Sequence, residues 1–203
     1  MRLDRIRRVY DERARRYDAT IGRAEAMMLG DFRRQFGALM TGATLEVGVG
    51  SGLNLPHYPA GAGPHAAIDL SAGMLEVARE RAATLGLAVL FAQGDAQRLP
   101  FPDATFDTVG VSLALCTIPD PERALREMRR VCRPAGKVVL LEHVLSPLWP
   151  VALLERAMTP LQARAIGCHL DRKTLETARA AGLRIESEQS RRLGVFRLAV
   201  ARP

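Results

Sequence analysis

The amino-acid sequence predicts an α/β fold: one mostly parallel, seven-stranded sheet with helices on both faces and an antiparallel hairpin at its edge. Three observations predict this fold. Short apolar stretches with strand composition alternate with stretches of helical spacing, as is typical of parallel sheets. A glycine-rich turn directly follows the first strand. Near the end of the chain, two strands joined by a short turn form the antiparallel hairpin.

The composition fits one globular domain. The 203 residues include 48% hydrophobic and 25% charged residues, which is ordinary for a protein with a buried core. No apolar run reaches the roughly 18 residues that a membrane span needs, and Arg2 and Asp4 stand where a secretory signal would be apolar. Because Cys116, Cys132 and Cys168 are far apart in the sequence, we interpret them as reduced core thiols and predict neither a disulfide framework nor a metal site.

Positive charge is concentrated towards both ends of the chain. The net charge of +7 divides into +4 for residues 1–40, −2 for 41–150 and +5 for 151–203. A basic surface made from both ends indicates an anionic partner, either nucleic acid or an acidic membrane face. The aromatic content is only 5%, and the sequence shows no basic and aromatic platform for stacking single strands.

The first 40 residues are predicted to be helical. Apolar side chains recur every three or four residues over 2–21, and a second helical stretch fills 22–40. Seven arginines lie between the apolar positions of the first stretch. This pattern is typical of a helix in a membrane interface, but it also suits a lid that packs on the fold. We therefore interpret 1–40 as an amphipathic lid or membrane-contact segment. The apolar positions are Leu3, Ile6, Tyr10, Ala14, Tyr17 and Ile21.

The strands and helices of the sheet follow in order. Strands are predicted at 43–49, 65–69, 88–94, 105–113, 136–144, 183–189 and 194–201, and helices near 72–86, 120–133 and 172–181. A Pro-punctuated apolar stretch fills 145–167. We interpret the chain as one domain, with a cofactor-binding core at 41–145 and with substrate-side helices and the edge hairpin at 146–203.

The glycine-rich turn runs from Glu46 to Gly52, in the order Glu-Val-Gly-Val-Gly-Ser-Gly. Glycine lets the chain turn tightly and lets a ligand approach the backbone without meeting a Cβ atom. The dinucleotide fingerprint GxGxxG would need glycine at position 53, where this chain has Leu53. The spacing is GxGxG instead, which by itself is also compatible with an ordinary turn.

Acidic residues stand at the ends of successive predicted strands. Glu46 belongs to the first strand, Asp69 ends the second and Asp95 ends the third. The carboxyl ends of neighbouring parallel strands face one crevice, and an acid about twenty residues beyond the glycine turn is placed to bind ribose hydroxyls. A crevice lined with carboxylates repels a pyrophosphate and suits a cationic ligand that carries a ribose and a base. S-adenosylmethionine fits that description.

Four segments together resemble the class I, Rossmann-like S-adenosylmethionine-dependent methyltransferases. They are the glycine turn, Ile68-Asp-Leu-Ser71, Gly94-Asp-Ala96 and Phe106-Asp-Thr-Val-Gly-Val-Ser112. The resemblance implies S-adenosyl-L-methionine as cofactor and S-adenosyl-L-homocysteine as product. It places Gly48, Gly50 and Gly52 at the amino acid part, Asp69 at the ribose, Leu70 and Met74 beside the adenine, Asp95 and Ala96 at the adenine amine, and Ser112 and Leu113 near the sulfonium. Tyr17 resembles a tyrosine that closes over the cofactor in the quinone-biosynthesis branch, and Glu46 and Asn54 complete the predicted set.

A narrower resemblance covers nearly the whole chain. The segments Val47–Pro59, Leu141–Val144 and Gly167–Arg172 resemble the bacterial phosphatidylethanolamine N-methyltransferases of the short, soluble type. This resemblance implies successive methylation of phosphatidylethanolamine to phosphatidylcholine by a peripheral membrane protein. The stretch 112–119 lacks the Asn/Asp-Pro-Pro-Tyr/Phe motif of many base-methylating enzymes, and we expect no nucleic acid partner.

The charge pattern agrees with attachment to an anionic membrane. Each basic residue near such a surface contributes on the order of 1 kcal/mol, and the first helix carries many. The stretch 148–154, which contains Trp149, is a second candidate contact, because tryptophan suits headgroup depth. It could equally form a core helix. We expect a monomer in the cytoplasm, bound peripherally to the inner face of the membrane.

The catalytic residues are expected at the amine substrate. An amine of pKa about 10.4 must lose a proton before it attacks, at a cost of roughly 4–5 kcal/mol at neutral pH. Desolvation beside a sulfonium lowers that pKa, and His143 and His169 are the candidate bases or proton relays. Tyr10 and Tyr17 could hold the methylated cation by cation–π contact and hydrogen bonding. All four could instead have packing roles only.

Other functions remain compatible with the sequence. The chain could methylate a quinone ring carbon, or a thiol or another small molecule, and in the latter case the basic helix would be only a lid. A cofactor-binding scaffold without catalysis is the remaining alternative.

Overall fold

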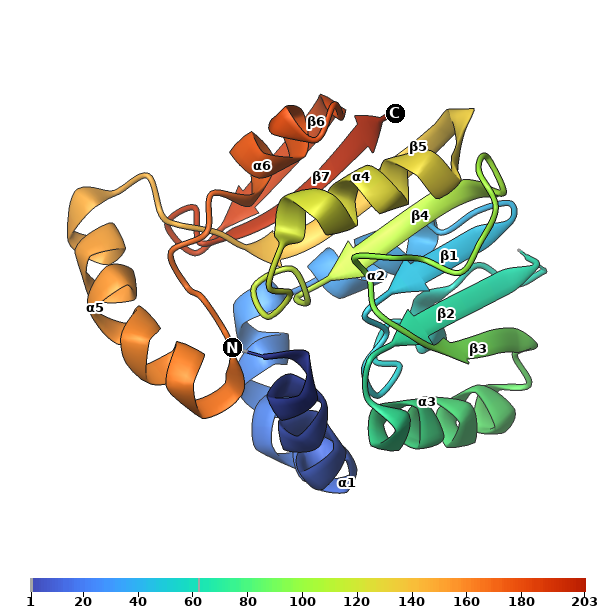
Figure 1. The fold of residues 1–203 in the computed structure, drawn as a ribbon, viewed down its shortest axis with the longest axis horizontal. Helices are drawn as coiled ribbons and strands as arrows, with labels where there is room; N and C mark the ends of the chain where they lie inside the picture. The colour runs from blue at the N-terminus through green and yellow to red at the C-terminus, as the bar shows by residue number, and fades with distance from the viewer. Residues whose placement is uncertain (1, 62) are drawn as a thin grey trace.

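The computed structural model describes residues 2–61 and 63–203, except for the side chains of residues 23 and 24. Its seven strands form one sheet in the order β3-β2-β1-β4-β5-β7-β6 (Figure 1). Strand β7 is antiparallel to its neighbours β5 and β6, whereas the other pairs are parallel. The strands are β1 (Thr44–Val47), β2 (His65–Asp69), β3 (Val89–Gln93), β4 (Phe106–Ser112), β5 (Cys132–His143), β6 (Arg184–Arg191) and β7 (Phe196–Arg202). The predicted fold class is therefore confirmed.

The helices surround this sheet. Helices α4 and α6 pack on one face, and α2 and α3 contribute to a second apolar cluster on the other. Helix α1 lies beyond the carboxyl ends of the central strands, and α5 extends to one side (Figure 1). Among the described residues, none of the helices combines the length and apolar character that a membrane crossing needs. The helices are α1 (Leu3–Leu29), α2 (Phe32–Leu39), the 3-10 turn η1 (Leu55–His57), α3 (Ala72–Leu85), α4 (Pro121–Val131), α5 (Trp149–Ile166) and α6 (Thr174–Ala180).

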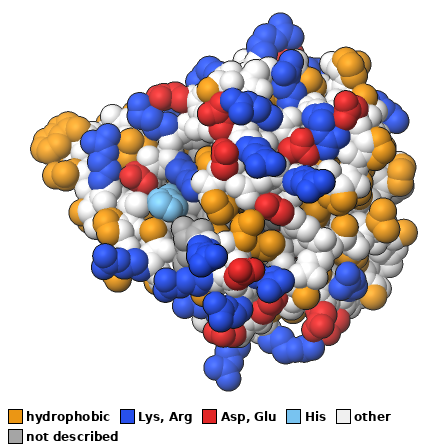
Figure 2. Space-filling view, viewed as in Figure 1, with side chains coloured by type: hydrophobic (Ala, Val, Ile, Leu, Met, Phe, Trp, Pro, Cys, Tyr) orange, Lys and Arg blue, Asp and Glu red, His pale blue; other side chains and the backbone are white. Residues whose placement is uncertain are grey.

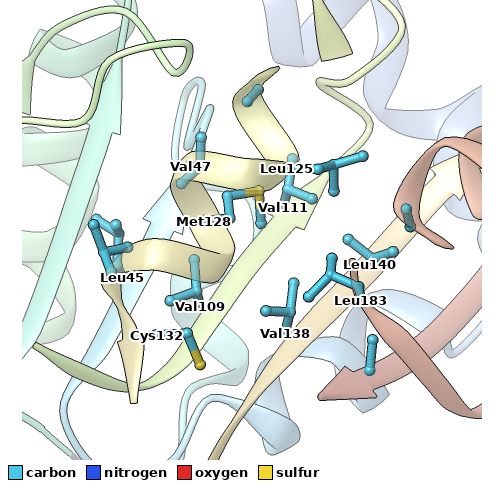
Figure 3. Packing of buried hydrophobic residues seen from close by; sticks show 14 of the residues in the cluster. Leu45, Val47, Val109, Val111, Leu125, Met128, Cys132, Val138, Leu140 and Leu183 are labelled. Carbon is cyan, nitrogen blue, oxygen red and sulfur yellow. The ribbon is translucent and has the colours of Figure 1, made fainter. Parts of the chain in front are cut away.

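The larger core cluster lies between the sheet and α4. Apolar side chains of β1 and β4 interdigitate there with Leu125 and Met128 of α4 (Figure 3). These central strands are buried on both faces, and the burial includes the polar side chains of Thr44, Glu46 and Thr108. A rigid centre of this kind fixes the carboxyl ends of β1, β2 and β4, which carry the predicted cofactor-binding residues Glu46, Asp69 and Ser112.

Three element boundaries differ from the sequence prediction. The first helix continues to Leu29, beyond the expected end at residue 21, and Gly30, at φ +57°, ends it before α2 begins. Strand β5 begins at Cys132, earlier than predicted. The stretch 145–167 contains one 18-residue helix, α5. Its Pro150 lies in the first turn, where a missing N–H costs nothing, and Pro160 is tolerated inside the helix.

Candidate active site

A deep pocket opens where β1, β2 and β4 end, and α1 covers it. It contains about 980 Å³ of empty space, including the part open to solvent. Strand β1 pairs in parallel with both β2 and β4, so the loops that follow these three strands converge. Open α/β sheets bind ligands at such a point, where the strand order reverses.

The glycine turn forms one wall of the pocket. Gly48 has φ +70°, and a Cβ atom there would lie 2.5 Å from the Cβ of Ala114. Gly50 has φ +55°, and its missing Cβ faces open space, with no atom within 4 Å. Both glycines line the pocket. Gly52 is not among the residues that line it, and a Cβ atom there would meet Leu55 and Ala78; its contact with the cofactor stays a prediction.

Asp69 is fixed at the end of β2 by the backbone. Its Oδ2 accepts a hydrogen bond from the N–H of Gly50 at 2.9 Å, and its Oδ1 accepts one from the N–H of Ser71 at 2.8 Å. Burial raises the pKa of this carboxyl despite these bonds. Each oxygen keeps a lone pair, so Asp69 can accept from the two hydroxyls of a ribose, as the sequence predicts.

A second buried carboxyl, on the neighbouring strand β1, also lines the pocket. Glu46 accepts hydrogen bonds from Asn54 Nδ2 and from the hydroxyl of Tyr58, both at 2.5 Å. Burial raises the pKa of Glu46 to about 7. Arg33 donates to Asn54 Oδ1 and forms an ion pair with the buried Glu25. A bound cation would favour the ionised form of Glu46 and lower its pKa.

Helix α1 is tied to the pocket by two aspartates. Asp11 Oδ1 accepts from Ser71 Oγ at 2.6 Å and from the N–H of Gly73 at 3.0 Å, so it caps the first turn of α3. Seven residues further along α1, Asp18 accepts from Ser51 Oγ at 2.6 Å and pairs with Arg81. The helix is therefore held on the loops that follow both β1 and β2.

The tyrosines that precede these aspartates line the pocket. The rings of Tyr10 and Tyr17 lie 6.3 Å apart between centroids. Burial raises the pKa of Tyr17 to about 12 and raises that of Tyr10 further. Both phenols therefore stay protonated near neutral pH. They can donate hydrogen bonds and present aromatic faces, but they are poor bases.

The end of β4 supplies the remaining wall. Ser112 Oγ is buried and has no hydrogen-bond partner among the described residues, so it is available to a ligand. Leu113 has φ +52°, a strained conformation for a residue with a side chain. Apart from Gly52, each predicted cofactor-binding residue lines this pocket. These residues are Tyr17, Glu46, Gly48, Gly50, Asn54, Asp69, Leu70, Met74, Asp95, Ala96, Ser112 and Leu113.

The two histidines are placed differently. His143 Nε2 lies 3.3 Å from Cys168 Sγ; burial alone would lower the pKa of His143, but its contact with Cys168 raises it. His169 has its pKa lowered by burial. Neither imidazole is among the residues lining the pocket. Their placement does not support direct removal of the substrate proton by either, and a catalytic role for them stays a prediction.

Sequence reasoning missed the polar residues that hold the lid and the charged end of the pocket. The spacing of Tyr10-Asp11 and Tyr17-Asp18 was the available signal, because a seven-residue interval puts both pairs on one face of a helix. Arg33 gave no such signal, since it is one of many arginines. The missed residues are Asp11, Asp18, Glu25, Arg33, Ser51 and Ser71.

Comparisons with known proteins agree with this geometry. Residues 45–140 match the family model described as "Methyltransferase domain". A phosphatidylethanolamine N-methyltransferase of Cereibacter sphaeroides is 40% identical over 148 residues, which are 70% of this chain and 70% of that protein. A demethylmenaquinone methyltransferase of Renibacterium salmoninarum is 34% identical over 148 residues, which are 70% of this chain and 60% of that protein.

Solved structures have the same fold. A complex of the Haloferax volcanii Trm112 activator with a methyltransferase contains a chain that matches with a TM-score of 0.75 at 20% identity, covering 95% of this chain and 96% of that one. Geranyl diphosphate methyltransferase in complex with S-adenosylmethionine matches with a TM-score of 0.69 at 16% identity, covering 85% and 83%. The chain belongs to the class I S-adenosylmethionine-dependent methyltransferase family.

The pocket fits S-adenosylmethionine as the cofactor. The buried acids Glu46 and Asp69 would each be stabilised in their ionised forms by a cationic ligand. The backbone at Gly50 leaves space that a Cβ would otherwise fill, and Ser112 Oγ lacks a partner among the described residues. Glu46 with Asn54 would hold the amino acid part, and Asp69 the ribose. When bound, the cofactor supplies a methyl group that is already activated for transfer.

Proposed function

We propose that this methyltransferase N-methylates phosphatidylethanolamine, and its mono- and dimethyl forms, towards phosphatidylcholine at a membrane surface. The relative from Cereibacter sphaeroides, which carries this activity in its name, supports the proposal through its 40% identity. The observation on which the membrane location depends is the apolar face of α5.

Helix α5 exposes a row of large apolar side chains. Trp149, at the start of the helix, is 77% exposed, and Leu161, in its second half, is 72% exposed. Figure 2 shows hydrophobic side chains gathered at the end of the molecule that α5 forms. Contiguous apolar surface of this kind marks a site of interaction with a membrane or a protein. The α5 face comprises Leu148, Trp149, Leu153, Leu154, Met158 and Leu161.

Neighbouring segments extend the α5 face and add positive charge. Ser146 Oγ donates to the carbonyl of Leu193 at 2.7 Å, which brings the exposed Leu193 next to the loop before α5. Arg192 is exposed on the same turn. At the other end of α5, Arg5 of α1 donates to the carbonyl of Arg164 at 2.9 Å. Apolar side chains flanked by arginines suit an interface with anionic lipid.

The first turns of α1 both line the pocket and contact α5. Leu3, Ile6 and Arg7, from the first turns of α1, line the pocket, and Arg5 contacts the carboxyl end of α5. A lipid held at the α5 face would therefore have its headgroup close to the pocket. An arginine at the mouth is suited to the lipid phosphate, because guanidinium groups bind phosphate oxygens well.

The pocket residues favour a neutral amine. Leu113, Ile118 and Ile6 make the substrate end apolar, and desolvation there lowers the pKa of an incoming ammonium group. Tyr10 and Tyr17 offer ring faces that attract the methylated cation. The pocket thereby aligns the nitrogen and excludes water, which is the main requirement for an in-line displacement.

A quinone ring carbon is the second candidate acceptor. The similarity to the demethylmenaquinone methyltransferase of Renibacterium salmoninarum supports this alternative, and the α5 face would also suit a membrane-dissolved quinone. The two candidates differ in the acceptor atom, and product analysis distinguishes them.

The test is methyl transfer from radiolabelled cofactor to liposomes. We expect label in lipid when the liposomes contain phosphatidylethanolamine, and none with phosphatidylcholine and phosphatidylglycerol alone. The variant Asp69→Asn serves as a control that should lose transfer. Incorporation into a demethylated quinone, with no labelled lipid amine, would reject the phospholipid proposal and favour the alternative.

A further inference from the structure

Three potential metal ligands converge outside the cofactor pocket. Cys116 comes from the loop after β4, His143 ends β5 and Cys168 follows α5. Their ligand atoms all lie within 4.8 Å of one another. Cys168 Sγ is 3.3 Å from His143 Nε2. Residues that are 27, 25 and 52 positions apart therefore meet at one point, which the cysteine spacing in the sequence did not indicate.

The three atoms lie near the spacing that a tetrahedral metal site requires. Zinc binds thiolate sulfur at about 2.3 Å and imidazole nitrogen at about 2.0–2.1 Å, so two of its ligands lie roughly 3.5–4 Å apart. The observed spacing needs only small side-chain movements to reach these values. We propose that Cys116, His143 and Cys168 bind a zinc ion through two sulfurs and one nitrogen, with the fourth position open.

The surroundings hold the ligands in place. The N–H of His169 donates to the carbonyl of Cys116 at 3.0 Å, which joins the Cys168 loop to the Cys116 loop. Arg172 donates to the carbonyl of Leu115. Glu142 Oε1 accepts from the N–H groups of Ala114 and Leu115. Both sulfurs are on buried residues. A site with preformed ligand positions loses little freedom when it binds an ion.

The alternative role for Cys116 and Cys168 is a reversible disulfide. A disulfide would account for the two cysteines at this point but not for His143. A disulfide does not need an imidazole beside it. His143 shares the same cluster of distances, and Cys with His is a ligand set that zinc prefers. The observations therefore favour a metal ion over a disulfide, and the experiment separates the two.

A metal ion bound here would restrain a loop that lines the pocket. Cys116 lies within a loop whose Leu113, Ala114, Thr117 and Ile118 line the pocket. A bound ion would join this loop to the end of β5 and to the segment after α5. We infer that it restrains the loop and does not touch the cofactor. This inference is independent of the lipid substrate.

Cobalt(II) and zinc(II) titrations of the reduced, chelator-treated protein test the proposal. We expect one cobalt ion per chain, with a thiolate-to-cobalt charge-transfer band in the near ultraviolet, and displacement by zinc. Cys116→Ala, Cys168→Ala and His143→Gln should each weaken zinc binding by more than about 100-fold, because loss of even an outer-shell partner costs about 10–100-fold. Cys132→Ala should bind as the parent does, because Cys132 Sγ lies elsewhere, against the carbonyl of Lys137.

Three results would overturn the proposal: no charge-transfer band, equal loss in Cys132→Ala, or unchanged binding in both site cysteine variants. Rapid formation of a Cys116–Cys168 disulfide by mild oxidant, without metal binding to the reduced chain, would also overturn it. Cofactor binding by each variant serves as the folding check. If one site variant does not fold, the decision rests on Tm measured with and without zinc. Zinc should raise the Tm of the parent and leave the Tm of a folded site variant unchanged.

Discussion

Helices α1 and α5 lie next to each other at the open end of the molecule, yet they are held in different ways. The first half of helix α1 buries Ile6 and Ala14, which are 6% and 3% exposed, and hydrogen bonds of Asp11 and Asp18 hold the helix in place. Helix α5 leaves large apolar side chains in solvent, and few contacts join it to α1. One helix completes the pocket, and the other offers a surface.

The comparison shows that an arginine-rich amphipathic sequence does not by itself reveal which helix leaves the more apolar surface exposed. The sequence suggested that the apolar stripe of α1 could insert into lipid. That stripe, including Ile6, packs against the fold and lines the pocket. The burial of Ile6 and Ala14 is compatible with the lid interpretation of α1, and contact of α1 with a membrane stays a prediction.

The largest effect should follow removal of both ties of the lid. Asp11→Asn with Asp18→Asn weakens hydrogen bonds to Ser71, Gly73 and Ser51 and the pair with Arg81. Charged hydrogen bonds contribute about 1.5–3 kcal/mol each, so cofactor affinity should fall by about 30-fold or more. Calorimetry with S-adenosylhomocysteine measures it. Liposome binding by the double variant should stay as in the parent. Unchanged cofactor affinity would mean that α1 does not shape the pocket.

The opposite result is expected for the α5 face. Trp149→Ser, Leu153→Ser and Leu161→Ser together remove large apolar groups, each of which contributes at most about 1.5–3 kcal/mol when fully buried in lipid. Sedimentation with anionic liposomes should weaken by about 10–30-fold, while cofactor affinity stays unchanged. Leu85→Ser and Leu90→Ser, at exposed apolar positions outside α5, form the matched control. If the control weakens sedimentation equally, α5 is not the contact.

A change of pH should affect cofactor binding in the pocket but not liposome binding at the α5 face. Burial raises the pKa of Glu46 to about 7, so the free protein ionises this group only as pH rises through 7. A cationic ligand prefers the carboxylate; cofactor affinity should therefore rise by about tenfold from pH 6 to pH 8. Glu46→Gln should flatten this dependence. Liposome binding through α5 involves apolar groups and arginines, which do not titrate in this range, and should change little.

The smallest effect is expected for Tyr17→Phe. The ring and its cation–π contact remain, and only the hydroxyl is lost, which is worth about 0.5–1.5 kcal/mol. We expect a 3–10-fold decrease in kcat/KM with little change in Tm. A loss as large as that of the double aspartate variant would show that the phenol has a larger role than closing the pocket.

The fold class and the order of the elements could be predicted from the sequence because they depend on local patterns, and most of the predicted cofactor residues line one pocket. Alternating strands and helices define the topology, and Glu46, Asp69 and Asp95 were placed by their positions at strand ends. The motif gives the spacing of its glycines but not the direction in which each one faces: a Cβ atom at Gly52 would meet Leu55 and Ala78, on the side away from the residues that line the pocket.

Contacts between distant segments were not predictable in this way. The meeting of Cys116, His143 and Cys168 depends on how the loops after β4 and α5 fold back. The direction of the α5 face depends on the rotation of a helix that has apolar residues on several sides. Both need three-dimensional information, since neither leaves a periodic signal in the sequence.

The cap that Asp11 places on α3 has a consequence for nucleotide selectivity. The N-terminus of a helix attracts phosphate groups, but here a carboxylate of the protein already occupies it. Asp69 lies beside this cap. Burial is the main cause of the raised pKa of Asp69, and the negative charge of Asp11 raises it further. An adenosine with a phosphorylated ribose would bring its phosphate against two negative groups. The enzyme should therefore discriminate against coenzymes such as NADP and admit nucleosides with free ribose hydroxyls.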